Sequence, residues 1–91
     1  MSKVFGRIAD EKFDKPLVEE LKKGNRSIPV IINVSNVINA VDYAKRLYER
    51  GEIERAYDVR GQDIQASAGS LYIPFLALSE EVTGIYLRYP G

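Results

Sequence analysis

The segment Ile28–Val34 (IPVIINV) most constrains what this chain can fold into. Its β-branched side chains favour an extended strand, and the run is too short for a buried helix. Apolar residues occupy both parities over much of the segment, so we expect a central strand covered on at least one face. Pro29 stands near the start of the segment, where a strand tolerates a residue without an N–H group. The chain therefore has to build a sheet around this strand.

A short amphipathic helix is predicted before this strand, over Asp14–Gly24. Asp14 is a favoured N-cap residue, and Pro16 falls in the first turn, where its missing N–H group costs nothing. Leu17 and Leu21, together with Val18, form one apolar stripe, and Gly24 supplies the C-terminal end. Residues 1–13 alternate only weakly between apolar and charged side chains, which leaves a flexible arm and a short edge strand both open.

A longer helix is predicted after the strand, over Asn36–Arg50, with Ser35 as its N-cap and Gly51 at its end. Its apolar face is expected at positions spaced by three and four residues, namely Val37, Val41, Ala44 and Tyr48, with Ala40 and Leu47 beside them.

The remaining elements are shorter. In chain order, we expect a strand over Ile53–Val59, a turn over Arg60–Asp63, a strand over Ile64–Ile73 with an interruption near Gly69, a helix over Phe75–Glu81 that Pro74 opens, and a strand over Val82–Tyr89. In the first of these strands, Ile53, Tyr57 and Val59 share one parity, which predicts that they lie on one face of the sheet.

The resulting order, β-α-β-β-α-β, predicts an α+β protein with a ferredoxin-like fold. Such a fold has an antiparallel four-stranded sheet with two helices on one face, and here a short N-terminal helix precedes it. We expect residues 1–26 to form an arm and that helix, and residues 27–91 to form the ferredoxin-like domain. The second face of the sheet is left open, so it needs either polar side chains or a partner.

Composition argues against an enzyme. The 91 residues contain no His and no Cys, which removes the usual nucleophile–base pairs, disulfides and all common zinc ligands except carboxylates. Neither a cofactor nor a metal is expected. Thirteen basic residues balance thirteen acidic ones, so no net field favours nucleic acid. The sequence contains no stretch of about 18 consecutive apolar residues, the length that a membrane-spanning helix needs. Residues 1–10 also lack the apolar stretch of a signal peptide. A cytoplasmic location follows as the expectation.

Four segments together resemble one known family: PLVEELKKG, IPVIINV, NAVDYAKRLYERG and LYIPFLALSEEVTGIYLRYP. They are similar to the propeptides of subtilisin-like serine proteases and to free-standing propeptide-like inhibitors, from Pro16 to the end of the chain. The valine-x-x-valine pair of that family appears as Val82 and Ile85. Two features depart from the family pattern: the second helix is very short, and the glycine–aromatic pair of the third strand is only loosely matched by Gly69-Ser70-Leu71.

The resemblance implies that the chain binds a subtilisin-like serine protease, as an inhibitor or as an intramolecular-chaperone-like propeptide. Members of the family place their open sheet face on two parallel surface helices of the protease. An acidic residue near the hairpin caps the N-termini of those helices, and Asp58 and Asp63 are the candidates here. The alternative for each aspartate is a local hydrogen bond to its own turn, which is common for aspartates in such positions.

The resemblance also implies that the C-terminal strand continues as an extended tail into the substrate groove of the protease. The residues expected in this tail are Tyr86, Leu87, Arg88, Tyr89 and Pro90. Tyr86 and Tyr89 have the spacing of the first and fourth pockets, and Pro90 would impede cleavage. The alternative is that Tyr86 or Leu87 packs in the core and that the last residues fray.

Two further alternatives stay open at this point. The chain is either a free intracellular inhibitor or a prodomain excised from a secreted protease, which would make it extracellular. A ferredoxin-like regulatory or ligand-sensing domain that forms a homodimer through its sheet is the second functional class.

Overall fold

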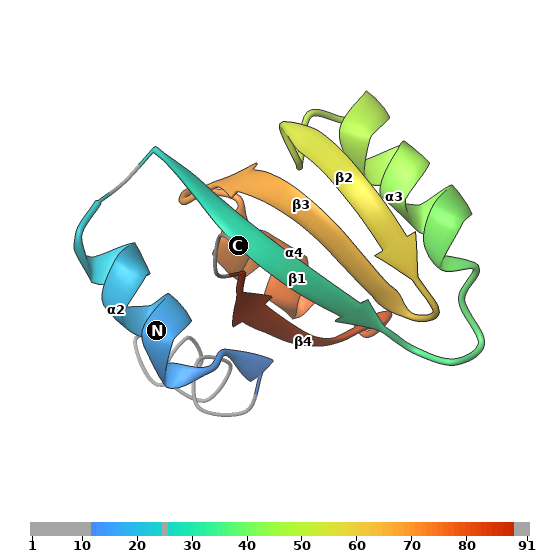
Figure 1. The fold of residues 1–91 in the computed structure, drawn as a ribbon, viewed down its shortest axis with the longest axis horizontal. Helices are drawn as coiled ribbons and strands as arrows, with labels where there is room; N and C mark the ends of the chain where they lie inside the picture. The colour runs from blue at the N-terminus through green and yellow to red at the C-terminus, as the bar shows by residue number, and fades with distance from the viewer. Residues whose placement is uncertain (1–11, 25, 89–91) are drawn as a thin grey trace.

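The computed structural model describes residues 12–24 and 26–88. The elements, in chain order, are α2 (Lys15–Lys22), β1 (Ser27–Val34), α3 (Ala40–Glu49), β2 (Arg55–Arg60), β3 (Asp63–Gly69), α4 (Ile73–Leu78) and β4 (Val82–Leu87). From β1 onward this order is the predicted βαββαβ. The four strands form one antiparallel sheet in the order β2-β3-β1-β4, which is a ferredoxin-like arrangement (Figure 1). The predicted α+β fold is therefore confirmed.

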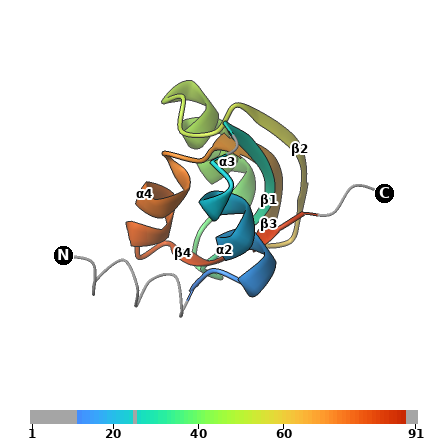
Figure 2. The same ribbon diagram turned by 90° about the vertical axis from the view of Figure 1, so that its left-hand side faces the viewer.

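The helices gather on one side of the sheet, as the view along its edge shows (Figure 2). Burial alternates along β1 and β3, as expected for strands with one covered face. The core residues that the strands contribute are Ile28, Val30, Ile32 and Val34 from β1, Ile64, Ala66 and Ala68 from β3, and Val82 and Ile85 from β4. No helix of the described residues covers the opposite face of the sheet, which we call the uncovered face.

The short helix α2 forms where the sequence predicts it. The Asp14 carboxylate accepts a hydrogen bond from the Leu17 N–H group at 3.2 Å, which satisfies one of the free donors at the helix start. Leu17 is 0% exposed and belongs to the same buried cluster as the strand residues. Phe13 forms a parallel bridge to Ile85, so the chain meets the outer edge of β4 just before α2 begins. The division of the chain at residue 26 stays a prediction.

The prediction of where α3 begins was wrong. Ser35 is not its N-cap; the helix begins at Ala40, and Asn39 caps it. The side-chain amide of Gln62, in the turn between β2 and β3, donates hydrogen bonds to the carbonyls of Ser35 at 2.6 Å and Ile38 at 3.0 Å. These contacts hold the segment before α3 as a turn, so the helix starts one turn later than its own sequence suggests.

The predicted apolar face of α3 was also wrong in part. Val37 is 88% exposed and precedes the helix, and Val41 and Tyr48 are exposed on it. They lie on the solvent side, where Val41 and Tyr48 line a groove between α3 and β2. The buried face carries the other possible i, i+3, i+4, i+7 series: Ala40, Tyr43, Ala44 and Leu47.

The boundary between β3 and α4 differs from the prediction as well. β3 ends at Gly69, and Ile73 is the first residue of α4 rather than the end of the strand. The Tyr72 N–H group donates to the Gly69 carbonyl at 2.9 Å, which closes a tight turn. The helix α4 begins at Ile73 and ends at Leu78, so both of its ends come earlier than in the predicted Phe75–Glu81. Ile73 is fully buried and packs in the core as the first residue of this helix.

Two strands, β2 at its start and β4 at its end, are shorter there than predicted. Ile53 lies before β2, because its N–H group donates to the Leu47 carbonyl and its side chain is buried in the core, and the strand itself begins at Arg55. At the other end, β4 closes at Leu87. The predicted last residue of that strand, Tyr89, lies outside the described residues.

A β-bulge interrupts β2 between Ala56 and Asp58, and it overturns the predicted parity of this strand. The extra residue is Tyr57, whose hydroxyl lies 2.7 Å from the Ser67 hydroxyl on the uncovered face. Val59 instead packs against the core side of the sheet. Tyr57 and Val59 therefore lie on opposite faces, although they are two residues apart.

Candidate functional site

The uncovered face presents one connected surface drawn from all four strands. Its side chains alternate with the core residues of their strands, and they are Pro29, Ile31 and Asn33 of β1, Asp63, Gln65 and Ser67 of β3, Arg55, Tyr57, Asp58 and Arg60 of β2, Tyr86 of β4, and Arg88 just after β4. The face mixes arginine, tyrosine and carboxylate side chains with few aliphatic ones. Such a surface is stable in water and is also chemically suited to a protein partner.

Asp63, the first of the two predicted capping residues, starts β3 directly after the hairpin turn. Its Oδ1 atom accepts a hydrogen bond at 2.6 Å from the side-chain amide of Asn33, its partner on β1. The Thr83 hydroxyl of β4 donates in turn to the Asn33 side-chain oxygen and, at 3.2 Å, to its carbonyl. This ladder across β3, β1 and β4 orients the Asp63 carboxylate on the uncovered face.

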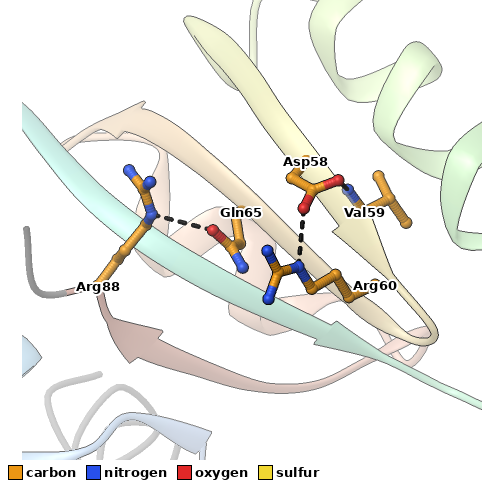
Figure 3. A network of polar contacts seen from close by, with 5 residues as sticks. All are labelled: Asp58, Val59, Arg60, Gln65 and Arg88. Carbon is orange, nitrogen blue, oxygen red and sulfur yellow. Dashed lines mark hydrogen bonds and ion pairs between the residues drawn. The ribbon is translucent and has the colours of Figure 1, made fainter. Parts of the chain in front are cut away.

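Asp58, the second predicted capping residue, lies on β2 and is exposed. Its carboxylate accepts from the Arg60 guanidinium at 2.8 Å and from the Val59 N–H group at 2.9 Å (Figure 3). The Arg60 hydrogen bond, followed by that of the Val59 N–H group, lowers the pKa of the Asp58 carboxyl below its ordinary value. Asp58 therefore makes the local contacts that were the alternative for a turn aspartate.

The two aspartates share a face but not a contact. Asp58 is paired with Gln65 in the register of β2 and β3, whereas Asp63 is paired with Arg60. Each carboxylate has its own partner, on β2 for one and on β1 for the other. A helix of a protein partner would therefore have to bind the Asp58 and Asp63 carboxylates through separate contacts.

The described part of the predicted tail divides between the two faces of the sheet. Tyr86 lies opposite Ile31 on the uncovered face and is 41% exposed, whereas Leu87 packs against the core. Arg88 follows, and its N–H group donates to the Pro29 carbonyl at 3.0 Å, which extends the pairing with β1 by one residue. The last two predicted tail residues, 89 and 90, lie outside the described residues.

The Arg88 side chain contacts residues of two other strands on this face. Its Nε atom donates to the Gln65 side-chain oxygen at 3.2 Å (Figure 3), and its guanidinium carbon lies 4.8 Å from the centre of the Tyr57 ring. The Arg55 guanidinium carbon lies 5.1 Å from the same ring. Sequence reasoning missed the roles of Tyr57 and Gln65. The parity of β3 places Gln65 on the uncovered face, but the bulge that exposes Tyr57 has no comparable signal in the sequence.

Two features, a metal cluster and a membrane-spanning helix, are absent from residues 12–24 and 26–88. Within this part of the chain, no group of three carboxylates is arranged to hold a metal ion. None of the helices described there is long and apolar enough to cross a membrane. The described residues of the predicted site, apart from Leu87, lie on the uncovered face.

Comparisons with protein-family models, with curated proteins and with solved structures find no match to this chain.

Proposed function

We propose that this protein binds a subtilisin-like serine protease, as an inhibitor or as a propeptide-like folding partner. The proposal rests on one observation: β4, the strand that leads into the predicted tail, contributes side chains to the uncovered face of the sheet. Tyr86 and Arg88 lie on the same face as Asp58 and Asp63. A partner seated on that face could therefore contact the sheet and receive the tail at the same time.

The chemistry of the face supports a protein partner. Tyrosine and arginine are the side chains that most often dominate binding energy at protein interfaces, and this face offers Tyr57, Tyr86 and three arginines. Tyr57 is 44% exposed, so it retains surface for a contact. The arginines and aspartates of the face can meet complementary charges on a partner.

Of the two aspartates, Asp63 is the better candidate for the capping contact. Both oxygens of Asp58 already accept hydrogen bonds from within β2. Asp63 uses Oδ1 to accept from Asn33, and no hydrogen bond from within residues 12–24 and 26–88 reaches its Oδ2 atom. A helix N-terminus of the partner could bind that second oxygen without breaking an existing contact.

The test is an inhibition assay with a bacterial subtilisin and a chromogenic peptide substrate. The 91-residue chain is expected to inhibit hydrolysis, and the inhibition is expected to decline slowly as the tail is cut. Removing residues 89–91 should weaken inhibition by about tenfold or more, because the tail supplies the contacts in the substrate groove. Undiminished inhibition by the shortened chain would overturn the tail mechanism.

Asp63→Asn tests the capping contact, with Asp42→Asn on the helical side as the matched control. A lost charge-assisted contact is expected to raise the inhibition constant by about tenfold for Asp63→Asn and to leave the control unchanged. Absence of inhibition across several subtilisins would overturn the proposed function. A tight dimer in sedimentation would then favour the self-associating domain.

A further inference from the structure

One cluster of side chains joins the end of β4 to the far edge of the sheet. Arg88 follows β4 and still pairs with β1, because its backbone N–H group donates a hydrogen bond to the Pro29 carbonyl at 3.0 Å. Its side chain then reaches Gln65 on β3 at 3.2 Å (Figure 3). The guanidinium carbon also lies 4.8 Å from the centre of the Tyr57 ring of β2. The residue that follows the last strand is thus held by the three other strands of the sheet.

Tyr57 is itself held in place for this contact. The bulge in β2 turns it onto the uncovered face, and β-bulges often re-aim a side chain in this way. Its hydroxyl is hydrogen-bonded to the Ser67 hydroxyl at 2.7 Å, and the Arg55 guanidinium lies over its ring at 5.1 Å. The ring therefore offers Arg88 a fixed cation–π partner rather than a mobile one.

No carboxylate within residues 12–24 and 26–88 lies at ion-pair distance from Arg88. The Tyr57 ring and the Gln65 amide, which hold the Arg88 guanidinium, are both neutral. A neutral partner holds the guanidinium without neutralising it, and salt weakens such a contact less than it weakens an exposed ion pair.

We infer that Arg88 is a positioning residue: Tyr57 and Gln65 anchor its side chain and so fix the end of β4 on the uncovered face. The inference rests on the proposed function for its consequence: a tail whose first residue is already held in place loses less entropy when it enters a substrate groove.

The bond between residues 88 and 89 gives a direct test, because trypsin cleaves after arginine. Trypsin has to take the Arg88 side chain into its own pocket, which requires that the side chain first leave Tyr57 and Gln65. Tyr57→Ala is expected to speed the release of residues 89–91, measured by mass spectrometry, by roughly two- to fivefold, the factor that corresponds to an exposed cation–π contact. Gln65→Ala should act in the same direction.

Tyr48→Ala is the matched control, since Tyr48 is an exposed tyrosine on α3. It should leave the release of residues 89–91 unchanged. Cleavage after Arg46 in α3 reports global unfolding in each variant, and only the ratio of the two rates is compared. The thermal midpoint of Tyr57→Ala should also stay within about 5 °C of the parent value. Equal rate ratios for Tyr57→Ala and the parent chain would overturn the inference.

The same variants are then assayed against subtilisin. Gln65→Ala, which removes an anchor of Arg88 without removing an interface tyrosine, is expected to shorten the period of inhibition, because a loosened tail is cut sooner. If the parent chain does not inhibit at all, the proposed function fails, and the tryptic rates alone decide whether Arg88 is anchored. If the parent chain inhibits and the tryptic ratios do not change, only the anchor fails.

Discussion

The ring of Tyr86 occupies the space that a Cβ atom on Gly84 would need. A Cβ built at position 84 would stand 2.8 Å from the Cζ atom of Tyr86, closer than such atoms approach one another. Residues two apart on a strand share a face, so Tyr86 folds back along β4 and covers the glycine. Aromatic side chains commonly cover sheet glycines in this way.

Gly84→Ala should therefore displace Tyr86 from the uncovered face. We expect the substitution to lower the free energy of unfolding by about 1 kcal/mol in the parent chain. In a Tyr86→Ala background the same substitution should be neutral or stabilising by up to about 1 kcal/mol, because alanine costs less conformational entropy than glycine in a strand. Urea denaturation of the four proteins gives the coupling energy, and simple additivity would contradict the contact.

A second prediction concerns Asp14, whose Oδ1 atom accepts from two N–H groups. One belongs to Leu17 in the first turn of α2 and the other to Leu87 at the end of β4, both at 3.2 Å. Asp14→Ala should lower the free energy of unfolding by about 1–3 kcal/mol, which combines the loss of an N-cap with the loss of a hydrogen bond to an edge strand.

Two conservative variants separate these contributions. Asp14→Asn keeps an acceptor oxygen in place and should retain most of the stability. Asp14→Ser can still cap α2 but is too short to reach β4, so it should speed hydrogen exchange at the Leu87 amide alone. Unchanged exchange at Leu87 in both Asp14→Ala and Asp14→Ser would show that the contact between the helix cap and β4 does not stabilise the strand.

The third prediction is a pH dependence at Asp58. Its folded-state pKa is lowered by the Arg60 and Val59 hydrogen bonds, so the charged carboxylate stabilises the folded state. This contribution is fully present above the ordinary aspartate pKa of about 3.9 and is lost as the pH falls through the lowered value. Parent and Asp58→Asn proteins should differ in thermal midpoint at neutral pH and converge in acid.

Asp42→Asn serves as the control for this titration, since Asp42 is an exposed aspartate in the first turn of α3. High salt should narrow the neutral-pH difference, because the Asp58–Arg60 pair is exposed to solvent. A difference that persists unchanged below pH 3 would contradict the assignment of the stabilisation to the ionised carboxylate.

The sequence predicted the elements whose signals are local. The Asp14 cap and Pro16 lie within the first turn of α2, and the helix forms there. The β-branched run of β1 and the order of the six elements from β1 to β4 were also predicted correctly, since strand periodicity and turn residues need no knowledge of distant contacts. The turn predicted over Arg60–Asp63 forms between β2 and β3, and Gly61 adopts a φ of 59° there.

The predictions failed where two local choices were similar in energy. Both Ser35 and Asn39 can cap a helix, and contacts from Gln62 decide in favour of the later start. Likewise α3 carries two apolar series, and only packing against the sheet selects the one that includes Leu47. Neither decision is encoded within the helix itself.

The candidate site was likewise predicted in part from local signals and was decided in part by tertiary contacts. The sequence by itself determined an α+β chain with an open sheet face, because the number and order of its elements leave too few helices to cover both sides. Only the tertiary structure decided which side chains meet on that face. The bulge that exposes Tyr57 depends on pairing with a strand about ten positions away, and Arg88 meets Gln65 across 23 positions. No local pattern carries that information.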